Sequence, residues 1–122
     1  MHLKRPVSYL ERSDFTDQGV LVNPQLNKKP LLVMLQAGFC GYCHQAKPAF
    51  QQFADEGLVT CATLQPDGDR QSEKDLQPII ERIYPNFKGY PSYILFTPDG
   101  RKIPHEGGRS TSNLREFVIQ YI

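Results

Sequence analysis

Two cysteines, Cys40 and Cys43, are separated by two residues in the segment AGFCGYCHQAKP, and His44 directly follows the second cysteine. Residues of these types at this spacing could perform three kinds of chemistry. A C-x-x-C pair can be a redox dithiol or half of a zinc site, and C-x-x-C-H can attach a c-type haem. The elements around the pair must decide which of the three applies.

The zinc and haem interpretations lack the partners that they need. A structural zinc site usually has four ligands, supplied by two C-x-x-C pairs or by one such pair and two spaced histidines. The chain has one further cysteine, Cys61, and its histidines are His2, His44 and His105, which form no second pair. A c-type haem needs a second axial ligand or a mostly helical shell, whereas this chain alternates strand and helix patterns. A redox-silent haem or metal module is therefore kept as an alternative only.

The redox interpretation fits the position of the pair along the chain. The apolar run Leu31–Leu35, bounded by Pro30 and Gly38, predicts a short strand that is buried on both faces. The segment Tyr42–Glu56 then has apolar residues at helical spacing, with a kink expected at Pro48. The two cysteines therefore stand where a central strand gives way to a helix.

A cysteine at a helix N-terminus meets unpaired backbone N–H groups and the positive end of the helix dipole, which stabilise a thiolate. We therefore expect Cys40 to be the nucleophile. Cys43 follows one turn later and is expected to be more buried, in position to resolve a mixed disulfide. The alternative without chemistry is a stable internal disulfide between the two cysteines.

The other predicted elements continue the alternation of strands and helices. The order β-α-β-α-β-α-β-β-α predicts an α/β fold over residues 1–122, with a mixed central sheet flanked by helices on both faces. The further elements are strands at Val7–Leu10, Leu58–Leu64 and Ser92–Thr97, short helices at Phe15–Val20 and Pro78–Tyr84, a polar loop at Pro66–Asp75, a hairpin turn at Pro98–Gly100, an edge strand containing Pro104, and a last helix with Asn113 and Glu116 at capping-box spacing.

The composition excludes several classes of partner. The chain has 14 basic and 13 acidic residues and a formal net charge of +1, so it lacks the electrostatic signature of binding to nucleic acid or an anionic membrane. No apolar run approaches the ~20 residues that span a bilayer. The N-terminal segment also lacks the apolar region of ~7–15 residues that a secretory signal contains. We expect a cytoplasmic monomer that uses no metal and no organic cofactor.

Five features, in order along the chain, resemble the thioredoxin family and especially its domains of the protein disulfide isomerase type. They are the strand LLVML, the segment Phe39-Cys40-Gly41-Tyr42-Cys43, the helix proline Pro48, the segment Gly89-Tyr90-Pro91-Ser92, and Gly108 before a capped last helix. The resemblance implies a single thioredoxin-like domain that exchanges thiols and disulfides in protein substrates. It implies as partners those substrates and a thiol reductant, such as a reductase or glutathione.

The resemblance also assigns the substrate-binding residues. It implies that Pro91 is cis and lies against the dithiol, and that the backbone of Tyr90 pairs with an extended substrate peptide. Phe39, Gly41 and Tyr42 are expected to complete the binding surface around the cysteines.

Two positions depart from the family pattern. Met34 stands where the family usually buries a carboxylate that accepts the proton of the second thiol, and Phe39 stands where it usually has tryptophan. His44 and Arg109 are candidates for tuning the thiols through their charges. Cys61, inside a predicted strand, is expected to be a buried and inert thiol.

The direction of the redox chemistry stays open. The Gly-Tyr pair between the cysteines resembles that of disulfide isomerases more than the Gly-Pro pair of thioredoxin reductants, and indicates a less reducing dithiol. A glutaredoxin-like reductase linked to glutathione is the nearest alternative within the same chemistry.

Overall fold

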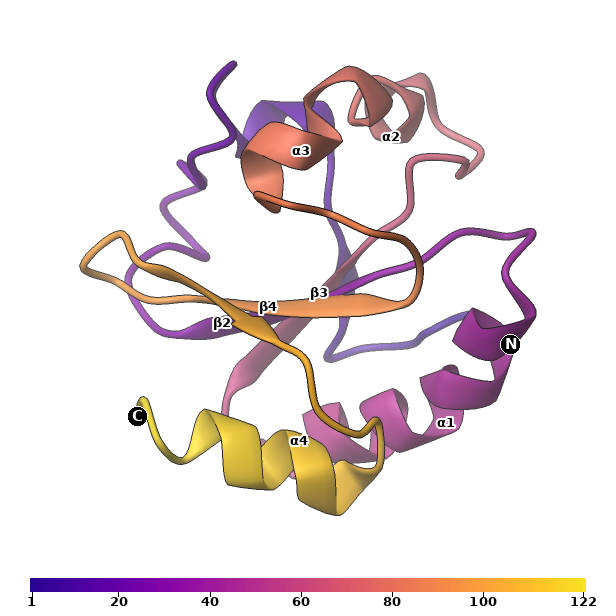
Figure 1. Ribbon diagram of the computed structural model, residues 1–122. Coiled ribbons are helices and arrows are strands. Elements are labelled where there is room, and N and C mark those ends of the chain that lie inside the picture. The colour runs from indigo at the N-terminus through magenta and orange to yellow at the C-terminus, as the bar shows by residue number, and fades with distance from the viewer.

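The computed structural model describes residues 1–122 and places a five-stranded sheet between two layers of helices (Figure 1). The strands lie in the order β1-β3-β2-β4-β5. They are β1 (Ser8–Tyr9), β2 (Leu31–Leu35), β3 (Thr60–Leu64), β4 (Ser92–Phe96) and β5 (Lys102–His105), and the helices are α1 (Gly41–Asp55), α2 (Gln71–Lys74), α3 (Ile80–Ile83) and α4 (Thr111–Val118), with 3-10 turns η1 (Arg12–Asp14) and η2 (Gln77–Ile79). No helix combines the length and apolarity that a membrane crossing requires.

Strand β2 forms the middle of the sheet, as its continuous apolar sequence predicts. It pairs in parallel with β3 and antiparallel with β4, and all five of its side chains are buried. Because side chains alternate along a strand, Leu32 and Met34 enter one buried cluster while Leu31, Val33 and Leu35 enter the other. The first cluster lies under α1 and α4, and the second lies under α3 on the opposite face of the sheet (Figure 1).

Helix α1 is the element that carries the dithiol. It buries Ala46, Phe50 and Phe53 against the sheet, whereas Pro48 lies on its exposed side. Burial of each phenylalanine ring stabilises the docked helix by about 1.5–3 kcal/mol. The helix therefore holds its first turn, with both cysteines, in a fixed place at the end of β2.

The predicted helix at Phe15–Val20 is wrong. No helix forms over these residues: the 3-10 turn η1 ends at Asp14, and Phe15 makes an isolated antiparallel bridge with Leu21. Gly19 has a φ of 79° and closes this turn, and a Cβ at that position would lie 2.4 Å from the backbone of Arg82. The close approach of Arg82 is a tertiary contact, which local helix signals do not contain.

Two smaller predictions also need correction. The predicted loop at Pro66–Asp75 contains the short helix α2. The last helix is capped by Ser110 and Asn113, not by Asn113 and Glu116: Ser110 Oγ accepts from the N–H of Asn113, and the side chain of Asn113 accepts from the N–H of Ser110. Serine is a strong N-cap residue, and here it starts the helix three residues earlier than the predicted cap.

Candidate active site

The dithiol lies at the first turn of α1, with Cys40 as the N-cap residue. The backbone N–H of Cys43 donates to Sγ of Cys40 over 3.1 Å, so the helix terminus is directed at the first sulfur. Both cysteines are free thiols. Cys40 is 9 % exposed and Cys43 is fully buried, which is the difference in accessibility that the sequence predicts.

Burial sets the chemistry of the second thiol. It raises the pKa of Cys43 to about 12, and the hydrogen bond with Cys40 acts in the same direction. The ammonium group of Lys47, one turn further along α1, acts to lower this pKa. Cys43 is therefore protonated at neutral pH and must lose its proton before it can attack a disulfide.

The turn between β2 and α1 is fixed by contacts at Gly38. Its N–H donates to both carboxylate oxygens of Asp67, over 2.9 and 2.8 Å. Nε2 of His44 donates to the carbonyl oxygen of Gly38 over 2.9 Å. His44 thus ties the helix to the turn, and its ring is directed at this carbonyl rather than at the sulfurs.

Aromatic side chains surround the dithiol at the surface. Phe39 is 79 % exposed and Tyr42 is 66 % exposed, on either side of Cys40 and next to the exposed Gly41. The ring of Phe39 meets that of Tyr90 edge-on, with centroids 6.1 Å apart. The Tyr90–Pro91 peptide bond is cis. The structure thus brings Phe39 and Tyr90 together across two loops that are far apart in the sequence.

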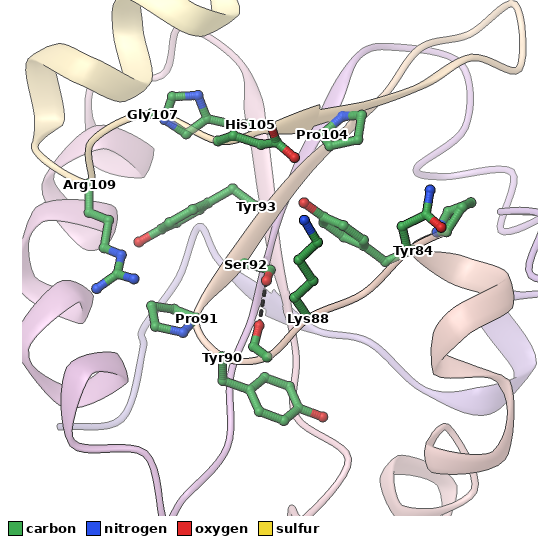
Figure 2. A pocket seen from close by; sticks show the side chains of 14 residues that line it. Tyr84, Lys88, Tyr90, Pro91, Ser92, Tyr93, Pro104, His105, Gly107 and Arg109 are labelled. Atoms are coloured by element: carbon green, nitrogen blue, oxygen red, sulfur yellow. Dashed lines mark hydrogen bonds between the residues drawn. The ribbon is translucent and has the colours of Figure 1, made fainter.

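A cleft of about 830 Å³ opens beside Pro91, between the loop before β4 and the loop after β5 (Figure 2). Arg109 and Tyr93 both line it, and the hydroxyl of Tyr93 points toward the guanidinium of Arg109 (Figure 2). The same guanidinium lies 5.8 Å from the centre of the Tyr42 ring, so Arg109 connects the cleft to the aromatic surface.

Comparison with known proteins agrees with the geometry of the site. No profile of a known protein family matches the chain. A thioredoxin-like protein of Invertebrate iridescent virus 6, 453L, is 35% identical over 133 aligned positions, which cover 97% of this chain and 96% of the relative. The chain belongs to the thioredoxin-like family. Its general chemistry is that of a thiol–disulfide oxidoreductase.

Larger relatives contain a region similar to this thioredoxin-like chain. The protein disulfide-isomerase of Saccharomyces cerevisiae is 28% identical over 94 positions, covering 75% of this chain but 17% of that protein. Among solved structures, the J-Trx1 fragment of ERdj5 superposes with a TM-score of 0.70 at 21% identity, covering 94% of this chain and 51% of the fragment. Zinc-bound human ERp44 superposes with a TM-score of 0.65 at 23% identity, covering 93% of this chain and 29% of that one. These likenesses confirm the predicted thioredoxin-like α/β fold.

Three residues of the thioredoxin-like site were missed by reasoning from the sequence: Lys47, Asp67 and Tyr93. Lys47 is buried, and its Nζ donates to the carbonyl oxygen of Met1 over 2.9 Å. Its place four residues after Cys43 puts it on the same face of α1, which is a signal that the sequence does contain. Asp67 and Tyr93 reach the site through loop closure and strand pairing, which have no local signal.

The structure shows the surroundings of Met34, which replaces the carboxylate usual in the family, and of the third cysteine, Cys61. Met34 is fully buried and pairs across β2 and β4 with Tyr93, so an apolar thioether stands beneath the dithiol. Cys61 is buried in β3, and burial raises its pKa to about 12. No three His, Cys, Asp or Glu side chains are grouped where they could hold a metal ion.

Proposed function

We propose that this thioredoxin-like chain exchanges disulfides in protein substrates, with Cys40 as nucleophile and Cys43 as resolving thiol. One observation carries the proposal: Cys40 caps α1, its sulfur accepts a hydrogen bond from the N–H of Cys43 and it remains 9 % exposed, whereas Cys43 is wholly buried. The arrangement gives the two thiols different accessibility and therefore different roles.

In the first step, the thiolate of Cys40 attacks one sulfur of a substrate disulfide. A bond forms between Cys40 Sγ and that sulfur, and the other substrate sulfur leaves as a thiolate. The N–H of Cys43 in the first turn of α1 donates to the attacking sulfur of Cys40.

In the second step, Cys43 loses its proton and attacks Sγ of Cys40. The Cys40–Cys43 disulfide forms, and the second substrate sulfur is released as a thiolate, so the substrate gains the two electrons that the dithiol loses. A thiol reductant, such as a reductase or glutathione, then returns the pair to the dithiol form.

The aromatic surface supplies binding for the substrate chain. Phe39, Tyr42 and Tyr90 offer apolar area beside the reactive sulfur, and the backbone around Pro91 is free to pair with an extended peptide. Exposed aromatic area of this kind favours protein substrates, because a peptide can cover it and a small thiol cannot.

A glutaredoxin-like activity with glutathione is the second candidate. Lys88 and Arg109 line the cleft beside Pro91, and neither is engaged in an ion pair. Two unpaired cations suit the carboxylates of glutathione. Saturation of the rate by glutathione, together with glutathione bound to Cys40, would favour this candidate over the first.

The proposal is tested by reduction of insulin disulfides with dithiothreitol as the reductant. We expect the wild type and Cys61→Ala to accelerate the reaction and Cys40→Ser to have no activity. Full activity in Cys40→Ser would contradict the proposed nucleophile. The reduction potential then gives the direction, because a value near about −270 mV indicates a reductase and a value near about −180 mV indicates an isomerase or oxidase.

A further inference from the structure

The hydroxyl of Tyr93 is buried without a hydrogen-bond partner. The residue is 2 % exposed, and the only other buried side-chain atom in this condition is Oε1 of Gln36. The amide nitrogen of Gln36 donates to Thr63, so one of the two polar atoms of that side chain has a partner. The hydroxyl is the only polar group of the Tyr93 side chain, and it has no partner. Folded proteins rarely leave a buried hydroxyl unpaired, and each such group needs an explanation.

The surroundings of this hydroxyl connect it to the dithiol. Tyr93 belongs to the same buried cluster as Cys40 and Cys43, and it pairs with Met34 across β2 and β4. The charges of a Cys43 thiolate and of Arg109 both act on the pKa of this hydroxyl, the thiolate raising it and Arg109 lowering it. Figure 2 shows the hydroxyl directed from β4 toward Arg109, beside Pro91.

The second step of the proposed reaction needs a group of this kind. Cys43 is fully buried, and no carboxylate is among the groups that shift its pKa. Nζ of Lys47 is already engaged with the carbonyl oxygen of Met1. A thiolate at Cys43 would therefore form in a largely apolar setting, in which a backbone hydrogen bond from Ala37 lowers the pKa of Cys43 and the hydroxyl of Tyr93 is the buried side-chain donor that has no partner. The titratable and charged groups that interact with Cys43 are Cys40 and Lys47 on α1 and Tyr90 and Tyr93 on the β4 side, and Arg109, ahead of α4, acts on Tyr93.

We propose that the hydroxyl of Tyr93 donates a hydrogen bond to the Cys43 thiolate during resolution, directly or through one water molecule. This rests on the proposed function. The proton of Cys43 leaves to water, and the resulting thiolate attacks Sγ of Cys40. The Cys40–Cys43 bond forms, the bond from Cys40 to the substrate breaks, and the substrate thiolate takes up a proton. Tyr93 keeps its own proton throughout and acts as a positioning residue for Cys43.

The test uses Tyr93→Phe, which removes the hydroxyl and keeps the ring. The reduced protein is mixed in a stopped-flow instrument with dithiobis(nitrobenzoate), a disulfide whose cleavage releases a coloured thiolate. A first phase reports attack by Cys40, and a second phase reports attack by Cys43 on the mixed disulfide. Tyr121→Phe is the matched control, because Tyr121 packs against the same buried cluster from the end of α4.

We expect Tyr93→Phe to keep the first phase within about twofold and to slow the second phase by about tenfold or more, because a hydrogen bond to a charged group is lost. The pH profile of the second phase should move upward by about one unit. Resistance to urea should stay equal or rise, because an unpaired buried hydroxyl is removed while the ring is kept. Tyr121→Phe should leave both phases unchanged.

Two results would overturn the role of Tyr93. One is a second phase in Tyr93→Phe that stays within about twofold of the wild type. The other is an equal slowing of both phases together with reduced resistance to urea, which would mean a structural role. A wild type without a first phase would instead contradict the proposed role of Cys40, so the two failures are distinguishable.

Discussion

The resolving step should depend steeply on pH. With a pKa of about 12, Cys43 is a thiolate in about one molecule in 10⁵ at pH 7 and in about one in 10³ at pH 9. Both values lie far below the pKa, so the thiolate fraction rises about tenfold with each pH unit. We therefore expect the rate of resolution to increase about 100-fold between pH 7 and pH 9.

The small thiolate fraction does not prevent turnover. Cys43 attacks a sulfur on the preceding turn of its own helix, and well-oriented intramolecular reactions reach effective concentrations of ~10⁵ M or more. Proximity can therefore offset most of the decrease in the rate of resolution that protonation of Cys43 causes. It leaves the slope of the pH profile unchanged.

The assay is the second phase of colour release from dithiobis(nitrobenzoate), followed at half-unit steps of pH. Cys43→Ala supplies the control, because it should show one phase only and stop at the mixed disulfide. A second phase that reaches its plateau below pH 9 would refute this reasoning, since it would mean that burial does not hold the thiol of Cys43 in its protonated form.

Three further predictions concern other parts of the site. Cys61→Ala should leave both redox phases unchanged but reduce the loss of stability at alkaline pH, measured by urea unfolding. The folded protein keeps the Cys61 proton, whereas the unfolded chain releases it above a pKa of 9.0. The buried thiol therefore lowers the free energy of unfolding by up to about 1.4 kcal/mol per pH unit between pH 9.0 and about 12. Asp67→Ala should lower the free energy of unfolding by about 1 kcal/mol and slow the first phase, because the N–H of Gly38 loses its acceptor. Phe39→Ala should change stability by less than about 0.5 kcal/mol, yet raise the KM for insulin by about tenfold while the reaction with dithiobis(nitrobenzoate) is unaffected.

The parts of the fold that carry the dithiol could be predicted because their signals are local. Leu31–Leu35 is a continuous apolar run, and it forms the central strand with the predicted bounds. The helix after the cysteines differs by one residue at each end from the predicted Tyr42–Glu56. The hairpin after β4 and the edge position of β5 likewise follow from short signals, the turn residues and Pro104.

The parts that could not be predicted depend on contacts between distant segments. Where the sequence predicts a helix at Phe15–Val20, Gly19 has a φ of 79° and lies too close to the backbone of Arg82 for a Cβ to fit. In the sequence, Tyr93 cannot be distinguished from the apolar residues of its strand. Only the pairing of β4 with β2 shows that it lies opposite Met34. The register between strands decides which side chains are neighbours, and that register cannot be determined from a single sequence.

The central claim is that Cys40 and Cys43 form one redox couple, and equilibration with glutathione buffers tests it most directly. Samples are quenched by alkylation at each ratio of reduced to oxidised glutathione and then mapped by peptide mass spectrometry. We predict a single two-electron transition between the free dithiol and a Cys40–Cys43 disulfide, with Cys61 as a free thiol throughout. A chain in which no Cys40–Cys43 disulfide forms at any ratio, or in which Cys61 is a disulfide partner, would contradict the claim.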